Sequence, residues 1–416
     1  MKTQRPFLHA ATLVLCLLLV SCDSRGQTPT SAGTPEPTRT PQADRSQRVG
    51  GVCEEGYCEL MYFGMPKEIK AEDTSPGWNE KGQKLIVTGT VFKIDGRTPA
   101  PNVVIYYHQT DSDGYYSTRN DKPENQTRHG HIRGWVKTDP NGKYTIRTIR
   151  PGPYPGREDP AHIHVMVKEP DIANEYWLDD LVFDDDKRLI PFRKRHPASA
   201  PRGGSGTLFP LIKGDIQIAE HDIILGLNIP NYPLKQIAEV RSGLDIGDNQ
   251  PSFGPFHAFG PDKGSEACPV CRYGRFQGVL YFVGTKPAWN DIRAWIAFLE
   301  QESVRRGKFL KVYFVYGDPR DYSRERRIRQ LEELGTQLNV KNVALTFVPS
   351  FADTETDANL NKIDPLVENT FVIFRQRRVV DKYIDLKPNA DSFRLISAAL
   401  DRTKSEFFDL PEPAHD

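Results

Sequence analysis

Short apolar runs separated by turn-forming residues dominate residues 84–230, and they limit this stretch of the chain to β structure. Four of the runs are rich in β-branched and aromatic side chains, which favour strands; they cover residues 85–92, 103–108, 144–149 and 161–167. Asp-Gly and Asn-Gly dipeptides at 95–96 and 141–142 supply tight turns. The pattern predicts an all-β antiparallel sandwich.

A different pattern begins at residue 278, where strands and helices alternate. Apolar strands are expected at 278–284, 311–316 and 343–348, with helices at 288–305 and 323–338 between them. A hairpin at 370–374 and 379–386 and a final helix at 391–400 complete the series. The alternation predicts an α/β domain, and its order resembles the thioredoxin-like fold.

The N-terminus has the features of an export signal. Lys2 and Arg5 precede an apolar run over 10–20 that is too short for a comfortable membrane span. The run ends in Leu-Val-Ser-Cys at 19–22, which resembles a bacterial lipobox with Cys22 as the lipidated residue. We expect a lipoprotein signal peptide over residues 1–22; an ordinary secretory signal is the alternative, and both predict export.

Composition marks the remaining domain boundaries. Residues 23–49 are rich in Ser, Thr, Pro and Gly and are expected to form a disordered tether. The sandwich domain is then assigned to 50–240, a Gly/Pro-rich linker to 241–264 and the α/β domain to 265–408. The 55 basic and 55 acidic residues balance, which gives no electrostatic case for a nucleic-acid partner.

Four further cysteines form two local pairs. Export favours disulfides, so we expect a Cys53–Cys58 bridge. Cys268 and Cys271 form a C-x-x-C pair that fits a redox dithiol, a structural or incidental pair, or a metal-binding pair. The pair precedes the expected strand at 278–284, whereas in thioredoxin-like enzymes the dithiol follows the first central strand, so the structural interpretation is favoured.

The sequence Pro-Ala-His-Ile-His at 160–164 is the sharpest chemical signal. Side chains two residues apart on a strand point to the same face, so His162 and His164 converge while Ile163 faces the other layer. Two imidazoles alone suit zinc, copper or iron equally, and a hydrogen-bonded histidine pair is the plainer alternative. A second His-x-His, His129 and His131, lies in a Gly/Arg-rich stretch and is expected to be solvated. The three aspartates at 184–186 are expected to form a solvated turn.

The surroundings of this motif resemble the intradiol ring-cleavage dioxygenases, which include the catechol and protocatechuate dioxygenases. The motifs lie in the same order, at residues 89–91, 106–115, 134–155 and 160–164. The resemblance implies a ferric ion held by Tyr115, Tyr154, His162 and His164. Tyr116, next to Tyr115, is an alternative for the first tyrosine.

The resemblance also implies a chemistry. Phenolates are hard anionic donors that favour Fe(III), and a chelated catechol becomes acidic enough to bind as a dianion and electron-rich enough to react with O2. Tyr154 would leave the metal and act as base, and Arg157 would assist near the substrate. The chain departs from the family at Asp159, where an arginine is usual, and at Asp180, in a stretch that usually carries a glutamine.

Three functions follow as hypotheses. The first is a non-haem Fe(III) intradiol dioxygenase, an oxidoreductase that cleaves a catecholic ring with O2 at the bacterial cell envelope, anchored to a membrane by lipid. The second is a catecholate-binding lipoprotein without turnover. The third is a thiol-redox lipoprotein that uses Cys268 and Cys271. The C-terminal domain is expected to serve as an interaction module, for a protein partner or a second copy.

Overall fold

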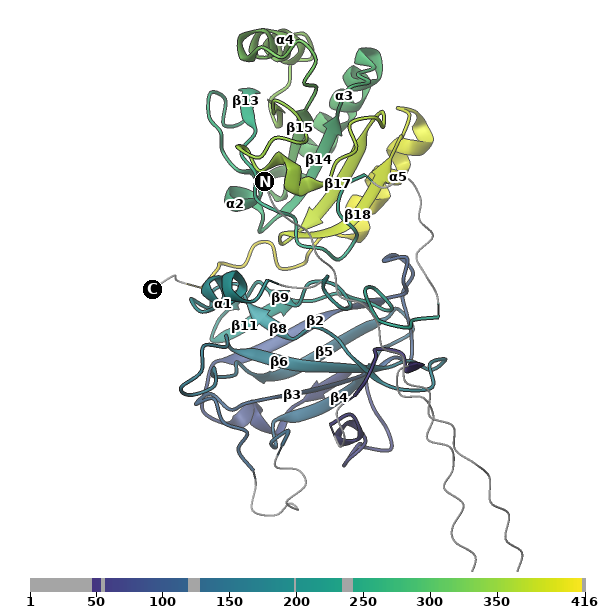
Figure 1. The fold of residues 1–416 in the computed structure, drawn as a ribbon, viewed down its shortest axis with the longest axis vertical. Helices are drawn as coiled ribbons and strands as arrows, with labels where there is room; N and C mark the ends of the chain where they lie inside the picture. The colour runs from purple at the N-terminus through teal and green to yellow at the C-terminus, as the bar shows by residue number, and fades with distance from the viewer. Residues whose placement is uncertain (1–46, 54–56, 119–127, 198–199, 234–241, 414–416) are drawn as a thin grey trace, which may run out of the picture. The chain divides into compact units, whose positions relative to one another are not determined.

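The computed structural model describes residues 47–53, 57–118, 128–197, 200–233 and 242–413 (Figure 1). The expected signal peptide, its Cys22 and nearly all of the expected tether lie outside the described residues. Within the described ranges, none of the helices combines the length and apolar character that crossing a membrane would require.

Two sheets form the region that the sequence assigns to a sandwich. The first has the strand order β1-β5-β2-β11-β10, with β12 also paired to β2. Its strands are β1 (Glu72–Thr74), β2 (Lys84–Phe92), β5 (Lys143–Ile149), β10 (Leu211–Lys213), β11 (Ile216–Glu220) and β12 (Ile223–Ile224). Two short 3-10 turns, η2 (Glu59–Met61) and η3 (Pro76–Asn79), precede β2.

The second sheet has the order β4-β3-β6-β8-β9, with β7 also paired to β6. Its strands are β3 (Val104–Gln109), β4 (Arg133–Lys137), β6 (His162–Lys168), β7 (Tyr176–Trp177), β8 (Leu181–Phe183) and β9 (Thr207–Leu208), and helix α1 (Leu189–Arg195) follows β8. The four strands expected from sequence are confirmed. The purely antiparallel pairing is wrong, because β1–β5, β2–β11, β2–β12 and β8–β9 are parallel pairs.

Alternation along β6 divides its side chains between two environments. Ile163, Val165 and Val167 join the apolar core between the sheets. Met166 lies on the other face and packs against Tyr106, together with residues of the N-terminal segment such as Met61. His162 and His164 share this outer face by the same alternation. The outer face of β6 is therefore where a site can form.

The α/β region is built on a sheet with the order β13-β16-β15-β14-β17-β18. Its strands are β13 (Phe256–Phe259), β14 (Gln277–Val283), β15 (Leu310–Tyr316), β16 (Val343–Phe347), β17 (Thr370–Arg375) and β18 (Arg378–Ile384). The helices are α2 (Pro269–Tyr273), α3 (Trp289–Arg306), α4 (Arg324–Gln337) and α5 (Ala390–Arg402), with 3-10 turns η5 (Gly307–Phe309) and η6 (Ala358–Asn361). The strands and helices expected from 278 onward are confirmed, each to within a few residues.

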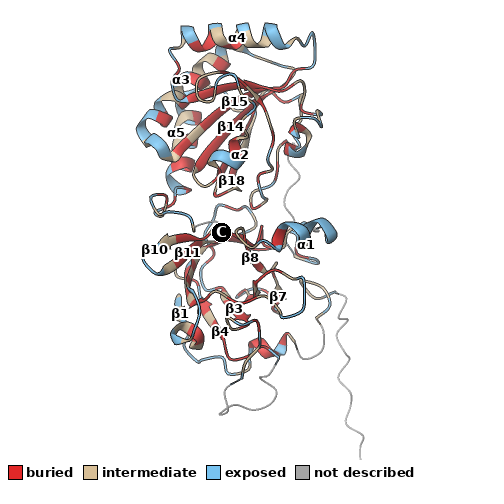
Figure 2. Cartoon of the chain, turned by 90° about the vertical axis from the view of Figure 1, so that its left-hand side faces the viewer, coloured by how far each residue is buried: buried red, intermediate tan, exposed pale blue. Residues whose placement is uncertain are grey.

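Both faces of this sheet are covered (Figure 2). Helices α3, α4 and α5 contribute to one core, which contains Trp295, Leu331 and Ile396. Loop residues, including Leu244 and Phe253, cover the other face. The linker predicted at 241–264 is therefore wrong over its described part: this stretch packs into the domain and supplies β13, because its few large apolar residues are core residues.

The connections resemble the predicted thioredoxin-like order only in part. From β14 the chain passes through α3 to β15 and through α4 to β16, moving away from β14 in one direction. It then returns to the other side of β14 to form the β17–β18 hairpin and α5. The thioredoxin-like assignment stays a prediction, whereas an α/β domain is what the structure contains.

Candidate metal centre

Strand β6 holds the two histidines of the Pro-Ala-His-Ile-His motif with their Nδ1 atoms anchored. His162 Nδ1 donates to the Pro160 carbonyl at 2.8 Å. His164 Nδ1 donates to the Asp180 carboxylate at 2.7 Å. Carbonyl and carboxylate oxygens only accept hydrogen bonds, so both Nδ1 atoms carry a proton, and in neutral imidazoles both Nε2 atoms then keep a lone pair for a metal.

Tyr154 contacts these Nε2 atoms, and Tyr116 contacts Tyr154. The Tyr154 hydroxyl, from the proline-rich loop after β5, lies 3.1 Å from His162 Nε2 and 3.3 Å from His164 Nε2. The Tyr116 hydroxyl lies 2.7 Å from that of Tyr154. Prolines at 151, 153 and 155 keep the Tyr154 loop out of the sheet ladder, so its side chain can reach across to β6.

Tyr115 does not join this cluster, which corrects its assignment as the first tyrosine. Its side chain is 59% exposed. Its backbone nitrogen donates to Asp111 Oδ1 at 3.0 Å, in the tight turn through Gly114 (φ 91°). The residue directly after the glycine closes this turn, and the next residue, Tyr116, faces the histidines. The alternative considered for Tyr116 is thus the one that the geometry supports.

The four side chains form a donor set that fits a ferric ion. Ligands bound at about 2.1 Å with angles near 90–110° are separated by about 3 Å. The spacings of 2.7, 3.1 and 3.3 Å around the Tyr154 hydroxyl match this separation. Two phenol oxygens and two imidazole nitrogens combine hard anionic and borderline donors, which suits Fe(III).

Asp180 contacts one of the donor side chains on the nitrogen that faces away from the centre of the cluster. Together with the two histidines it is a group that could hold a metal among the described residues. Its oxygen, however, is committed to His164 Nδ1, the nitrogen that points away from Tyr154. An acidic partner on the rear nitrogen fixes the ring and increases the basicity of the front nitrogen. Asp180 therefore fits as a support for His164.

Burial favours a neutral His162 and disfavours ionised phenols. Burial, followed by the nearby His164, lowers the pKa of His162, so its imidazole stays neutral. Burial raises the pKa of Tyr116, and the hydrogen bond with Tyr154 raises it further. Burial also raises the pKa of Tyr154. The two phenols therefore need a cation between them to become phenolates at neutral pH.

A cavity of about 530 Å³ adjoins this cluster. Its described lining residues are Val52, Cys53, Tyr57, His108, Tyr116, Arg128, His129, Tyr154, His164, Trp177, Leu178 and Asp180. His108, on β3, pairs in register with His164, and its ring stacks on that of His164 with centroids 4.6 Å apart. The His129 ring stacks on the other side of His108 at 3.7 Å. His108 was not predicted from the sequence, where its only signal was its place on an expected strand.

The solvated interpretation of His129 and His131 is wrong. Their exposed fractions are 2% and 8%. His129 Nδ1 bonds the Tyr106 hydroxyl at 2.8 Å, and His131 Nε2 lies 2.6 Å from Glu80. The acidic turn at 184–186 is also engaged: Asp185, for example, forms two hydrogen bonds with Arg150, at 2.7 and 2.8 Å. Tertiary partners that are far away in sequence account for both differences.

Arg157 lies beside the cluster rather than inside it. Its guanidinium sits 5.2 Å from the centre of the Tyr154 ring. Its Nε donates to Asp159 at 3.0 Å, and its side chain is 65% exposed. The residue is thus near Tyr154, while its assistance to the reaction stays a prediction.

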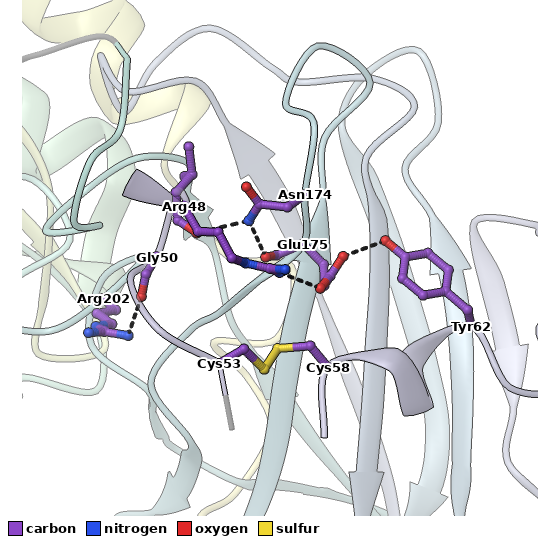
Figure 3. The surroundings of a disulfide bond; sticks show 9 residues. Arg48, Gly50, Cys53, Cys58, Tyr62, Asn174, Glu175 and Arg202 are labelled. Atoms are coloured by element: carbon purple, nitrogen blue, oxygen red, sulfur yellow. Dashed lines mark hydrogen bonds and ion pairs between the residues drawn. A yellow bond between two sulfur atoms is a disulfide. The ribbon is translucent and has the colours of Figure 1, made fainter. Parts of the chain in front are cut away.

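The two cysteine pairs lie in different regions. Cys53 and Cys58 form a disulfide in the N-terminal segment, and Figure 3 shows it next to the Arg48–Glu175–Tyr62 network. Cys53 also lines the cavity. Cys268 and Cys271 form a disulfide at the start of α2, before β14, where the Ser252 hydroxyl lies 3.2 Å from Cys271 Sγ.

Comparison with known proteins identifies the segment that carries the cluster. Residues 65–194, which include Tyr116, Tyr154, His162 and His164, match a family model described as Dioxygenase. The chain is 31% identical over 124 residues to catechol 1,2-dioxygenase of Acinetobacter baylyi, covering 26% of this chain and 39% of that protein. It is 29% identical over 153 residues to catechol 1,2-dioxygenase 1 of Acinetobacter lwoffii, covering 30% and 47%. The match spans less than half the length of these relatives.

Solved structures give weaker matches. The dioxygenase domain of a carbohydrate-binding fusion protein from a cellulolytic Streptomyces is 24% identical, with a TM-score of 0.30, covering 39% of this chain and 91% of that chain. An intradiol ring-cleavage dioxygenase from Tetranychus urticae is 19% identical, with a TM-score of 0.28, covering 38% and 88%. The family match and the curated relatives together show that the segment at 65–194 is similar in sequence to dioxygenases, including the catechol 1,2-dioxygenases.

Proposed function

We propose that the chain is a non-haem Fe(III) intradiol dioxygenase that cleaves a catecholic ring between its two hydroxylated carbons with O2. The observation that carries the proposal is the convergence of Tyr116 and Tyr154 with the free Nε2 atoms of His162 and His164. Relatedness of this segment to catechol 1,2-dioxygenases supports the same class of substrate.

Each group of side chains in the cluster has a separate role in the proposed reaction. A ferric ion bound here would supply Lewis-acid chemistry that makes catechol hydroxyls acidic and the bound ring reactive toward O2. Tyr154, at the centre of the cluster, would serve as the base, because its phenolate can take up a proton from a catechol hydroxyl. The hydrogen bonds from Nδ1 to Pro160 and Asp180 hold both imidazoles in position throughout. The stacked His108 and His129 rings form a wall that a planar substrate can pack against.

A second candidate is binding of catecholates without turnover. The Arg157–Asp159 pair favours it, because Asp159 neutralises a cation that would otherwise stabilise negative charge on the substrate. Both candidates require the same metal and differ in the fate of the bound ring.

Three measurements on purified, iron-loaded protein test the proposal: iron content, the visible tyrosinate-to-iron charge-transfer band, and O2 uptake with a panel of catechols. We expect one iron per chain, a red-brown colour and stoichiometric O2 uptake. Tyr116→Phe should shift or weaken the band and abolish uptake, whereas the matched control Tyr115→Phe should change neither.

Each outcome discriminates. A colourless protein that iron cannot restore would contradict the metal centre. Spectral changes with catechols but no O2 uptake would favour the binding protein. Equal effects of the Tyr115→Phe and Tyr116→Phe substitutions would remove the assignment of Tyr116.

We also propose that the protein is exported to the bacterial cell envelope and anchored by lipid at Cys22, as the lipobox-like sequence supports. Labelled palmitate should be incorporated into the native protein and not into the Cys22→Ser variant.

We propose that the C-terminal domain serves as a thioredoxin-like interaction module. Its Cys268–Cys271 disulfide leaves thiol redox as a competing role, which disulfide-exchange activity lost in a Cys268→Ser/Cys271→Ser variant would support.

A further inference from the structure

The cavity beside the metal centre is larger than a catechol ring needs. Its volume of about 530 Å³ lies within the range of roughly 300–1,000 Å³ that is typical of sites for larger ligands. The room extends from Tyr116, Tyr154 and His164 to residues of the N-terminal segment, such as Tyr57, and to Arg128. A substrate that fills this space carries a substituent on its ring.

A row of rings connects the metal centre with Arg128. The His164, His108 and His129 rings are stacked in succession, with centroid separations of 4.6 and 3.7 Å. The Tyr57 ring follows at 6.3 Å from His129, and the Arg128 guanidinium lies 4.9 Å from the Tyr57 centre. The row gives an aromatic substituent a continuous surface that ends at a positive charge.

The described residues that line the cavity do not neutralise the positive charge of Arg128. Among the described residues that line the cavity, Arg128 is the only lysine or arginine, and it is exposed. The acidic side chain among those residues, Asp180, is committed to His164. Among the described residues, Arg128 packs on Tyr57 and forms no ion pair with a carboxylate. A guanidinium held in this way offers paired N–H donors to an incoming anion.

Both residues of this pair are held by neighbours that are fixed. Tyr57 directly precedes Cys58, which is buried and joined to Cys53 (Figure 3). Arg128 directly precedes His129, which is buried and bonded to Tyr106. The Tyr57–Arg128 pair is therefore positioned on two anchored backbone segments rather than on free loop tips.

We propose that Arg128 is a specificity-determining residue that binds a carboxylate on the substrate, so that the preferred substrate is a catechol with an acidic side arm. This inference rests on the proposed dioxygenase function and goes beyond it by naming the substrate class. Tyr57 positions the guanidinium, and the catechol hydroxyls occupy the other end of the cavity.

The test compares ligands that differ only in the charge of the arm. Iron-loaded protein is titrated without O2 with 3-(3,4-dihydroxyphenyl)propionate, its methyl ester and unsubstituted catechol. Affinity is measured by calorimetry and by the change in the visible band. We expect the acid to bind about tenfold or more tightly than the ester, because a charge-assisted hydrogen bond is lost with the ester. Added salt should reduce the difference.

Variants assign the preference to a residue. Arg128→Gln should bring the acid to the affinity of the ester and leave the ester and catechol unchanged. Arg128→Lys should retain part of the preference. Arg147→Gln is the matched control, since Arg147 lies on β5, pairs with Glu72 and does not line the cavity; it should keep the full preference.

Two results would overturn the inference alone: equal affinity for acid and ester in a protein that still cleaves catechols, or an equal loss for all three ligands in Arg128→Gln. Failure of the native protein to bind any catechol would instead overturn the proposed function, and this inference with it.

Discussion

Strands β6 and β14 are equal in length but differ in how their side chains are buried. Each has seven residues, but β6 alternates between the inter-sheet core and its outer face, whereas every residue of β14 is buried. Layers of side chains cover both faces of β14, so each position serves packing. The outer face of β6 carries His162 and His164, and His164 on this face lines the cavity. A strand can supply ligands only where one of its faces is not needed for the core.

The two regions are expected to differ most in the effect of removing a histidine. His162→Ala should abolish iron retention, the visible band and O2 uptake, because it removes one of the proposed iron ligands. His257, on β13, has both ring nitrogens bonded to backbone carbonyls; His257→Ala should lower stability and leave one iron per chain. Metal analysis and melting curves of both variants check this. Loss of iron in His257→Ala would show that the regions are not independent.

Removing a large core side chain of the α/β region tests the same independence. Phe314 on β15 is fully buried, and Phe314→Ala should destabilise the protein by about 3–5 kcal/mol. Denaturant unfolding followed by far-ultraviolet circular dichroism measures the loss. The iron spectrum should remain native in water. A change in that spectrum would mean that packing around β15 also supports the metal centre.

A smaller effect is expected from the support behind β6. Asp180→Asn keeps a hydrogen-bond acceptor for His164 Nδ1 but removes the negative charge. Iron affinity should fall about 10–100-fold, as is typical when the partner of a metal-bound histidine is changed. Competition with a chelator measures the affinity. An Asp180→Asn protein with no iron at all would indicate that Asp180 is itself a ligand.

The smallest effect concerns the N-terminal segment that borders the cavity. Burial alone would raise the pKa of Glu175, but the hydrogen bonds from Tyr62 and Arg48 outweigh it, and the pKa is lowered from 4.5. Its contribution to stability is therefore complete above about pH 4.5 and is lost as the pH falls through the folded-state pKa. Glu175→Gln should cost about 1 kcal/mol at neutral pH and nothing in acid. A loss that does not vary with pH would contradict this.

The sequence predicted the parts that local pattern determines. Strand runs, the alternation of strands and helices, and the shared face of His162 and His164 all depend on near neighbours, and the structure contains them. The choice between Tyr115 and Tyr116 depended on the geometry of the Gly114 turn, which exposes the Tyr115 side chain to solvent and directs that of Tyr116 toward Tyr154. Composition could not show that.

The remaining misses have a common physical cause. His108 reaches the centre through the β3–β6 register, and His129 is buried by Tyr106. The expected linker is part of a core because Leu244 and Phe253 join apolar residues of strands farther along the chain, such as Phe282 on β14, whose ring lies 6.1 Å from that of Phe253. Pairings between distant segments decide these positions, and no local pattern encodes them.

The Cys53–Cys58 disulfide links the completeness of the cavity to where the chain resides. Thiols stay reduced in the cytoplasm and become oxidised after export. A chain kept in the cytoplasm would retain the histidines and tyrosines but leave the wall around Cys53 and Tyr57 without its cross-link. If the proposed export takes place, the compartment would act as a maturation step, because this part of the cavity wall would become cross-linked only after the chain has crossed the membrane.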